Sequence, residues 1–261
     1  MPFVFKFVIF SLSILIATFS YAEDIFESDS YELEPLLTDK SLDISAELGA
    51  LFTTGNSEST SIFWKVAVKH EIESWRVKYS FESLFKQDEL TDNETGQQIT
   101  KTSAEKYLLN AEANYEMTEK KSLFVFAGSD FDRFGAYRSI TSLVAGYSFR
   151  AIDGSLISWD LNIAPGFTRV EEQQQSSESA PVLRASSAFQ WLVNSHAKLS
   201  QNTSIEASSI NTRVIIEAAV AAKLHGSMLM KVAFKATSND DVKEGLAHTD
   251  TSTSVTLVVN F

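Results

Sequence analysis

Twelve charged side chains alternate with apolar residues along the chain, and their types and spacing make them the first candidates for chemistry. They carry both signs of charge, and they are Lys65, Lys69, Arg76, Lys78, Glu82, Lys106, Glu112, Arg213, Glu217, Lys223, Lys231 and Lys235. If they share one interior surface, they can set the selectivity of an ion or solute path. They can equally pair with one another and fill that interior. The sequence leaves both possibilities open.

An acidic segment near the C-terminus offers a second kind of chemistry. His248 lies close in sequence to Asp240, Asp241 and Asp250, and a His–Asp pair can activate water as a general base. This segment defines a hydrolase alternative. A catalytic site needs groups from several elements, however, and the chain has no Gly-x-Ser-x-Gly elbow, Walker loop or dinucleotide fingerprint. We therefore expect no enzymatic activity and no cofactor.

The other histidines do not indicate a metal site. His70, His196 and His225 fall in or beside expected turns, where a solvated side chain is the simplest interpretation. The chain has no cysteine, and zinc sites normally use cysteine or closely spaced histidine. We therefore expect no metal centre.

The elements that must position these side chains are β-strands. From Leu42 onward apolar and polar residues alternate with a period of two, and no segment of helical length carries the i, i+3, i+4 pattern. Two segments alternate less clearly, 122–133 because Phe124 and Phe126 make both faces apolar, and 197–206 because its pattern is weak. The sequence predicts twelve strands, at 42–54, 59–70, 74–86, 103–116, 122–133, 137–150, 156–171, 182–193, 197–206, 210–224, 227–238 and 249–261.

Strands of this kind form either a soluble sandwich or a membrane barrel. The expected strands have about 10 to 14 residues, which fits the roughly 9–11 residues of a tilted bilayer crossing better than the roughly 5–6 residues of a sandwich strand. Every second connection is short, whereas 87–102, 172–181 and 239–248 are longer, as in outer-membrane barrels. We predict an all-β fold, a transmembrane antiparallel up-and-down β-barrel of about 12 strands.

Aromatic residues bracket the apolar face of several expected strands. The pairs are Tyr107 with Tyr115, Trp159 with Phe167, and Trp75 with Phe85. Eight residues of tilted strand span roughly 20 Å, close to the apolar band of about 25 Å between the aromatic girdles of a membrane barrel. The outer face is therefore expected to contact the lipid bilayer and lipopolysaccharide.

The chain ends on an alternating strand, SVTLVVNF, with Val259 and Phe261 on its apolar face. A barrel must close, because an open sheet edge in lipid leaves backbone groups unpaired, so the last strand is expected to pair with the first. This ending also resembles the terminal signal that outer-membrane barrels present to the assembly machinery. That machinery is an expected partner, whereas the formal net charge of −12 argues against nucleic acid.

The N-terminal part has a different composition. Residues 1–22 combine one cation, an apolar run at 7–19 and a small-residue ending, which is the order of a secretory signal peptide cleaved after Ala22. Residues 23–41 are rich in carboxylates and are expected to form a flexible acidic lead-in. Residues 42–261 are expected to form the barrel, exported to the bacterial outer membrane.

Three stretches resemble the YdiY-type family of salt-induced outer membrane proteins: "LDISAELGALFTTGNSESTSI", "SAEKYLLNAEANYEMTEKKSLFVFAGSDFDRF" and "YRSITSLVAGYSFRAIDGSLISWDLNIAPGFTRVEE". The resemblance covers about 220 residues, and its most telling positions are Gly55-Asn56, Asp132, Arg138, Gly146-Tyr147, Pro165-Gly166-Phe167 and Arg169. The segment 239–248 departs from the family in lacking a proline-containing turn and in being more acidic. The resemblance implies an outer-membrane barrel linked to salt or osmotic response, without an established activity or site.

The expected function is that of a non-enzymatic outer-membrane barrel, either a narrow ion or solute pore or an envelope-stabilising protein in osmotic response. Two alternatives stay open. One is an outer-membrane hydrolase with its site around His248. The other is a soluble periplasmic β protein that binds an apolar ligand.

Overall fold

The structure is a computed structural model that describes residues 41–53, 58–91, 98–173, 177–242 and 247–261. The expected signal peptide and nearly all of the expected acidic lead-in lie outside the described residues. The described residues begin with a strand at Ser41, one position before the expected start of the barrel.

Twelve strands make up the described fold, as the alternation predicts. They are β1 (Ser41–Thr53), β2 (Glu58–Ile72), β3 (Trp75–Thr91), β4 (Gln98–Thr118), β5 (Lys121–Asp132), β6 (Tyr137–Asp153), β7 (Ile157–Glu172), β8 (Ser177–Asn194), β9 (Ala197–Ser208), β10 (Thr212–His225), β11 (Met228–Asn239) and β12 (Thr249–Asn260). Among the described residues, no helix is long and apolar enough to cross a membrane.

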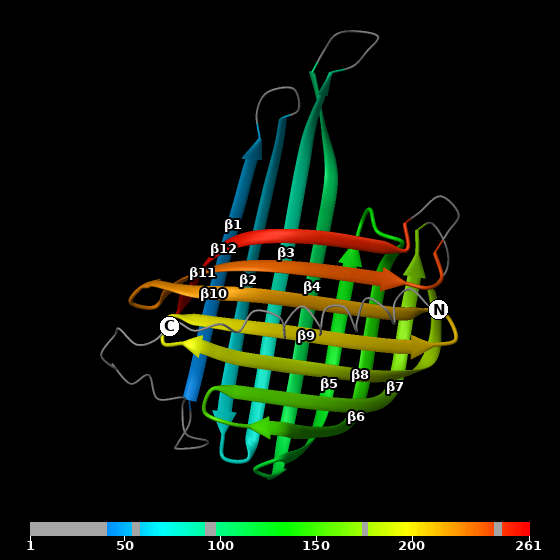
Figure 1. Cartoon of the computed structure of the whole chain (residues 1–261). Coiled ribbons are helices and arrows are strands. Elements are labelled where there is room, and N and C mark those ends of the chain that lie inside the picture. The colour runs from blue at the N-terminus through cyan, green and yellow to red at the C-terminus, as the bar shows by residue number, and fades with distance from the viewer. Residues whose placement is uncertain (1–40, 54–57, 92–97, 174–176, 243–246) are drawn as a thin grey trace, which may run out of the picture. The chain divides into compact units, whose positions relative to one another are not determined.

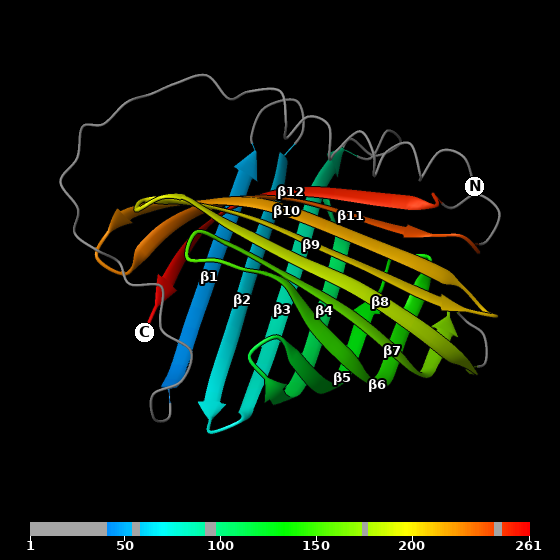
Figure 2. The same cartoon turned by 60° about the horizontal axis from the view of Figure 1, so that its bottom comes forward.

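The strands close into one antiparallel barrel in which each strand pairs with its neighbours in the sequence (Figure 1). The barrel is completed by β1 and β12, with Ser45 opposite Asn260 and Leu48 opposite Leu257. Figure 2 shows β8–β12 crossing in front of β1–β5 at a steep angle, as the tilt of strands in a closed barrel requires. The predicted up-and-down barrel is confirmed.

The two ends of the barrel differ in their connections. At the short-turn end, where β1 begins and β12 ends, the connections have two or three residues; at the opposite loop end they have three to nine. Two expected long connections are shorter than predicted. The ladder of β3 and β4 continues past a bulge at Lys86 and Gln87 to pair Thr91 with Gln98, and β8 begins before Pro181. The first extension is polar, so the apolar alternation does not reveal it.

The outer face of the barrel is apolar. Leu48, Leu143 and Phe167 are 63%, 57% and 68% exposed, and their neighbours along each strand point inward and are more buried. A soluble protein rarely exposes so much contiguous apolar surface, whereas a transmembrane barrel presents such a surface to lipid. This face argues against the alternative of a soluble periplasmic protein.

Aromatic side chains form rows across neighbouring strands on the outer face. One row joins Trp64 to Phe81, Phe81 to Tyr107 and Tyr107 to Phe131, with ring centroids 4.9, 6.4 and 6.0 Å apart. Nearer the short-turn end, Trp75 and Tyr115 lie 5.2 Å apart. Of the aromatic residues expected on this face, Trp75, Tyr107, Tyr115, Trp159 and Phe167 are at least 36% exposed, and Phe85 is half-buried.

One part of the barrel interior is apolar. Phe124 and Phe126 of β5 point inward and form a buried cluster with Val144, Ala164 and Val182, which explains why both faces of this strand are apolar. The inward aromatic rings of this cluster occupy one side of the lumen.

The neighbouring strands β6 and β7 approach each other closely at Gly166. A Cβ atom added to this glycine would lie 2.1 Å from the Leu143 carbonyl oxygen.

Candidate functional site

Charged side chains face one another across the lumen, and the strand register places the first group. Glu47 of β1 lies opposite Lys65 of β2, which lies opposite Glu82 of β3. Residues directly opposite in an antiparallel pair share one face, so opposite charges alternate along this row. Lys65 Nζ lies 3.7 Å from Glu82 Oε2.

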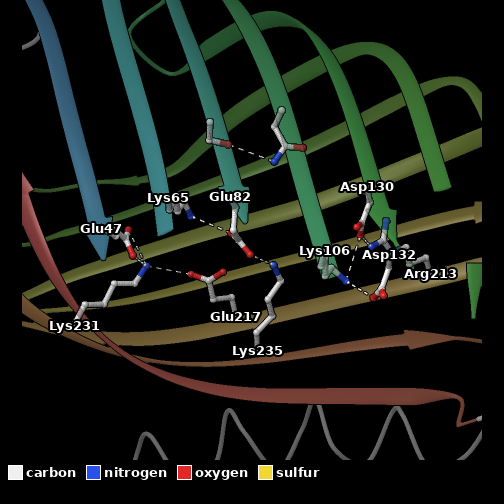
Figure 3. Close-up of polar contacts among 12 residues, drawn as sticks. Glu47, Lys65, Glu82, Lys106, Asp130, Asp132, Arg213, Glu217, Lys231 and Lys235 are labelled. Carbon is white, nitrogen blue, oxygen red and sulfur yellow. Dashed lines mark hydrogen bonds and ion pairs between the residues drawn. The ribbon is translucent and has the colours of Figure 1, made fainter. Parts of the chain in front are cut away.

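Two lysines of β11 connect this row to the other side of the barrel (Figure 3). Lys235 Nζ donates to Glu82 Oε1 at 3.0 Å, although β11 and β3 are separated by three strands around the barrel. Lys231 Nζ donates to both carboxylate oxygens of Glu47 at 3.2 Å and lies 3.6 Å from Glu217 Oε1. The Lys235–Glu82 contact crosses the lumen, whereas the contacts of Lys231 follow its wall, because β10 is the neighbour of β11 and only β12 separates β11 from β1.

A second group joins opposite walls. The guanidinium group of Arg213 on β10 donates to Asp130 on β5, and the two strands are separated by four strands in one direction and six in the other. Lys106 Nζ lies 3.7 Å from Asp130 Oδ2 and 3.3 Å from Asp132 Oδ2. Figure 3 shows Lys106 and Arg213 converging on these two carboxylates. Asp130 and Arg213 are 6% and 9% exposed.

A third group lies along the wall from β5 to β9. Arg184 of β8 pairs with Glu206 of β9, and its guanidinium lies 4.2 Å from the centroid of the Phe126 ring. Ser142 of β6 donates to Glu206 Oε2 at 3.1 Å. We call the three groups together the ionic layer. Its members are Glu47, Lys65, Glu82, Lys106, Asp130, Asp132, Arg184, Glu206, Arg213, Glu217, Lys231 and Lys235.

A cavity of about 890 Å³ lies between the ionic layer and the short-turn end. Its wall carries further ion pairs: Arg76 is 2.7 Å from both Glu71 and Glu116, and Lys78 is 3.7 Å from Glu112. Of the twelve charged residues that the sequence singles out, nine line the cavity: Lys65, Lys69, Arg76, Lys78, Glu82, Glu112, Arg213, Glu217 and Lys235.

The remaining three residues of that set have different positions. Lys106 and Lys231 lie in the ionic layer through the contacts above. Lys223 lies two residues from Ala221 on the inward-facing side of β10, opposite Leu229. The structure therefore places all twelve on the inner side of the barrel, while their part in conduction stays a prediction.

Several charged residues of the lumen are missing from the sequence-based set. Asp130 lies in the segment whose two faces are both apolar, and Glu206 and Lys198 lie in the weakly alternating segment. Arg184 and Arg150 lie at inward positions that alternation could have identified, and Arg150 donates to both oxygens of Asp160 at 2.8 and 3.3 Å. Every second residue of β9 is polar, and this pattern could have predicted that Lys198 and Glu206 point inward.

The loop end of the lumen is also bridged. The Tyr137 hydroxyl group at the start of β6 donates to the carbonyl oxygen of Asp241, which follows β11. Tyr137 packs with Ile140 and Val170 in a buried cluster, and Asn211 Nδ2 donates to Asn239 Oδ1 at 2.8 Å. The Tyr137–Asp241 contact spans the mouth, whereas the other contacts join the neighbouring strands β6 and β7, and β10 and β11.

The described contacts of the His248 and Asp240 side chains are with backbone groups. His248 Nδ1 lies 3.0 Å from the carbonyl oxygen of Asn239, and the Asp240 carboxylate accepts the backbone N–H of Thr212 at 2.5 Å. No described contact joins His248 to an aspartate. Among the residues that the structure describes, no group of three or more His, Asp or Glu side chains could hold a metal ion.

The terminal strand is held by its backbone. Phe261 N donates to the Ile44 carbonyl oxygen at 2.8 Å, and Ile44 N donates to the Phe261 carbonyl oxygen at 3.3 Å. Val259 lies opposite Ala46, and Phe261 is 76% exposed. Recognition of Val259 and Phe261 by the assembly machinery stays a prediction.

Similar proteins are found among known sequences and among solved structures. The chain is 29% identical over 156 residues to the uncharacterized protein YdiY of Escherichia coli (strain K12), and the match covers 59% of this chain and 62% of that protein. Among solved structures, the NanC porin gives a TM-score of 0.47 at 8% identity, covering 84% of this chain and 98% of that one. An outer membrane channel from Pseudomonas putida F1 gives 0.47 at 8%, covering 91% and 100%.

The family assignment comes from the sequence. Residues 46–261, nearly the whole described barrel, match the family described as "Protein of unknown function, DUF481". The match to YdiY agrees with the resemblance that the residue pattern suggests. The chain therefore belongs to the DUF481 family of proteins, whose function is unknown.

Proposed function

We propose that this protein is a non-enzymatic outer-membrane barrel that provides a narrow ion path, closed at rest by the ionic layer. The apolar outer face, the closed strand order and the expected signal peptide support the location. The crossing of the lumen by charged side chains supports a closed resting state.

The contact between Glu82 and Lys235 is the observation that carries this proposal. In a water-filled pore, charged side chains stand along the wall and attract ions. Here a lysine reaches 3.0 Å from a carboxylate that is three strands away around the barrel. Ions can pass only where such pairs separate, and salt weakens ion pairs by screening them. We infer that conduction rises more steeply with ionic strength than the conductivity of the solution does.

The outer surface and the final strand supply the expected partners. Exposed apolar and aromatic side chains form the surface that faces the bilayer and lipopolysaccharide. The exposure of Phe261 supports recognition by the assembly machinery, because the backbone of this residue holds the strand to β1. Support for a non-enzymatic role comes from the contact of His248 with a backbone carbonyl group.

Swelling of proteoliposomes in an isosmotic solution of potassium chloride, whose two ions are small, tests the proposal. Wild-type protein should give slow swelling, and the variant Glu82→Ala/Lys235→Ala should give faster swelling because it removes one crossing. The matched control is Glu105→Ala/Arg133→Ala, which removes an ion pair of 2.8 Å whose arginine is 62% exposed and which lies outside the ionic layer. Folding of each variant is checked by the shift of the unboiled protein on a gel.

Three outcomes decide between the alternatives. Faster swelling of the lumen variant alone supports the closed path. Fast swelling of the wild type, equal in both variants, contradicts closure by the ionic layer. Folded protein that gives no swelling in any form contradicts the path itself and favours an envelope-stabilising role.

A further inference from the structure

The cavity at the short-turn end contains a lysine without a carboxylate partner. Lys198 of β9 lines the cavity and is half-buried. Among the described residues, no ion pair or hydrogen bond joins its ammonium group to another side chain. The inward carboxylates of the barrel wall, in contrast, have partners: Asp160 pairs with Arg150, Glu112 with Lys78 and Glu217 with Lys231.

The surroundings of Lys198 are positively charged. Lys198 lies opposite Ala221 of β10, which lies opposite Lys231 of β11, so the two lysines share the inner face about 10 Å apart, two strand spacings. Lys69, a further cation, lines the same cavity. A half-buried ammonium group without a counter-ion is costly, and a bound anion would offset that cost.

Neutral hydrogen-bonding groups continue from Lys198 along the wall. Asn202 and Ser204 follow it on the inner face of β9 and line the cavity, and Ser204 lies opposite Ser186, which lies opposite Asn162. The Asn162 amide donates to the Ser186 hydroxyl oxygen at 3.1 Å. Its carbonyl oxygen is buried and has no described partner, although buried acceptors are nearly always satisfied.

We propose that this cavity binds a small hydroxylated organic anion from the short-turn end, with its anionic group on Lys198 and its hydroxyl groups on the polar side chains that follow along the wall, beginning with Asn202, four residues or roughly 13 Å along β9. A cavity of about 890 Å³ is within the usual range for small-molecule sites, roughly 300–1,000 Å³. This inference rests on the proposed function and deepens it, because it names the class of solute that the barrel accepts.

Calorimetric titration of the refolded full-length barrel in detergent at low ionic strength tests the inference without any transport. The probes are gluconate, inorganic phosphate and uncharged glucose. Gluconate should bind, glucose should bind more weakly for lack of the anionic group, and phosphate should bind more weakly for lack of the hydroxyl groups. Added salt should weaken the gluconate interaction, since screening reduces the attraction between charges.

Two substitutions locate the site. Lys198→Gln should lower the gluconate affinity by about tenfold, the effect of losing one charged contact. Lys101→Gln is the matched control: it removes the same charge from an exposed position on β4, opposite Asp88 and far along the strand toward the loop end, and it should leave the affinity unchanged. Lys198→Arg keeps the charge and should retain binding, which separates loss of the site from misfolding.

The contradicting results are equally specific. Wild-type affinity in Lys198→Gln, or no gluconate binding at all, overturns the site. Equal binding of phosphate and gluconate overturns the role of the polar side chains along the wall. These outcomes are independent of conduction: a barrel that swells as proposed but binds no gluconate refutes only the inference, and one that binds gluconate without conducting refutes only the path.

Discussion

Arg213 and Asp130 pair from opposite walls of the barrel, and both side chains are at least nine-tenths buried. The pair fixes the separation of β10 and β5 at the level of the ionic layer. A second cation, Lys106, shares the same carboxylate, so Asp130 holds two cations from two strands. Removing this one carboxylate therefore has consequences for both stability and permeation.

Loss of the Asp130 carboxylate should destabilise the barrel. Asp130→Asn leaves Arg213 and Lys106 without their shared anion, and breaking a buried pair costs about 3–5 kcal/mol. Urea unfolding in detergent micelles, followed by tryptophan fluorescence, should give a free energy of unfolding lower by about 3 kcal/mol. The control Glu105→Gln breaks a pair with a largely exposed arginine and should cost less than about 1 kcal/mol. Equal losses in both variants would contradict the buried character of the crossing.

Neutralising Glu82 should change ion preference. Glu82 is the partner of both Lys65 and Lys235, so Glu82→Gln leaves two cations of the ionic layer without this carboxylate. The reversal potential in a salt gradient should shift toward anion preference relative to the wild type. Glu178→Gln, at an exposed position at the start of β8, removes the same charge and should leave the potential unchanged. A shift in the control alone would place selectivity at the loop end.

The close approach of β6 and β7 should not tolerate a side chain at Gly166. An added Cβ would lie 2.1 Å from a backbone oxygen and 2.7 Å from the Val144 Cα atom, and overpacking of this kind costs about 1–3 kcal/mol. Gly166→Ala should therefore reduce the folded fraction seen as a shift of the unboiled protein on a gel. Gly154→Ala, whose nearest contact would be 3.1 Å, should fold like the wild type. Normal folding of both variants would contradict the packing of this region.

The terminal phenylalanine should matter in cells more than in detergent. Phe261→Ala keeps the backbone hydrogen bonds to Ile44 and removes an exposed ring, so the urea midpoint of refolded protein should not change. The amount of folded barrel in the outer membrane of expressing cells should fall. Phe134→Ala removes another exposed ring, 44% accessible, and should have no effect on that amount. An unchanged membrane yield for Phe261→Ala would refute the assembly role.

The alternation of residues predicts most of the fold, because inward and outward environments impose a period of two on every strand that crosses the bilayer. The alternation predicts less where the inner and outer faces of a strand have similar polarity. The ends of β3 and β4 are polar on both faces, so their ladder past Gln87 gives no periodic signal. Pro181 suggests a strand end, yet it pairs with Phe167 inside the β7–β8 ladder.

The ionic layer is harder to predict than the strands that carry it. Alternation places Glu82 and Lys235 on the inner face, but which residues meet across the lumen depends on the barrel diameter and the strand stagger. The sequence-based set omits Lys198 and Glu206, because Gln201 and Thr203 make the outer face of β9 only weakly apolar and the alternation is therefore unclear. The inward positions of Phe124 and Phe126 are explained by their contacts in the fold. Both pack in the apolar cluster with residues of β6–β8, and Phe126 also contacts Arg184.

Single-channel recording in planar bilayers tests closure by the ionic layer most directly. Refolded wild-type protein should give no steps or small ones whose conductance rises more steeply with salt than the solution conductivity, and Asp130→Ala/Arg213→Ala should give larger steps at every salt concentration. Large, steady wild-type steps that the double variant leaves unchanged would contradict the account, because the ion path would then bypass the pair that joins β5 to β10.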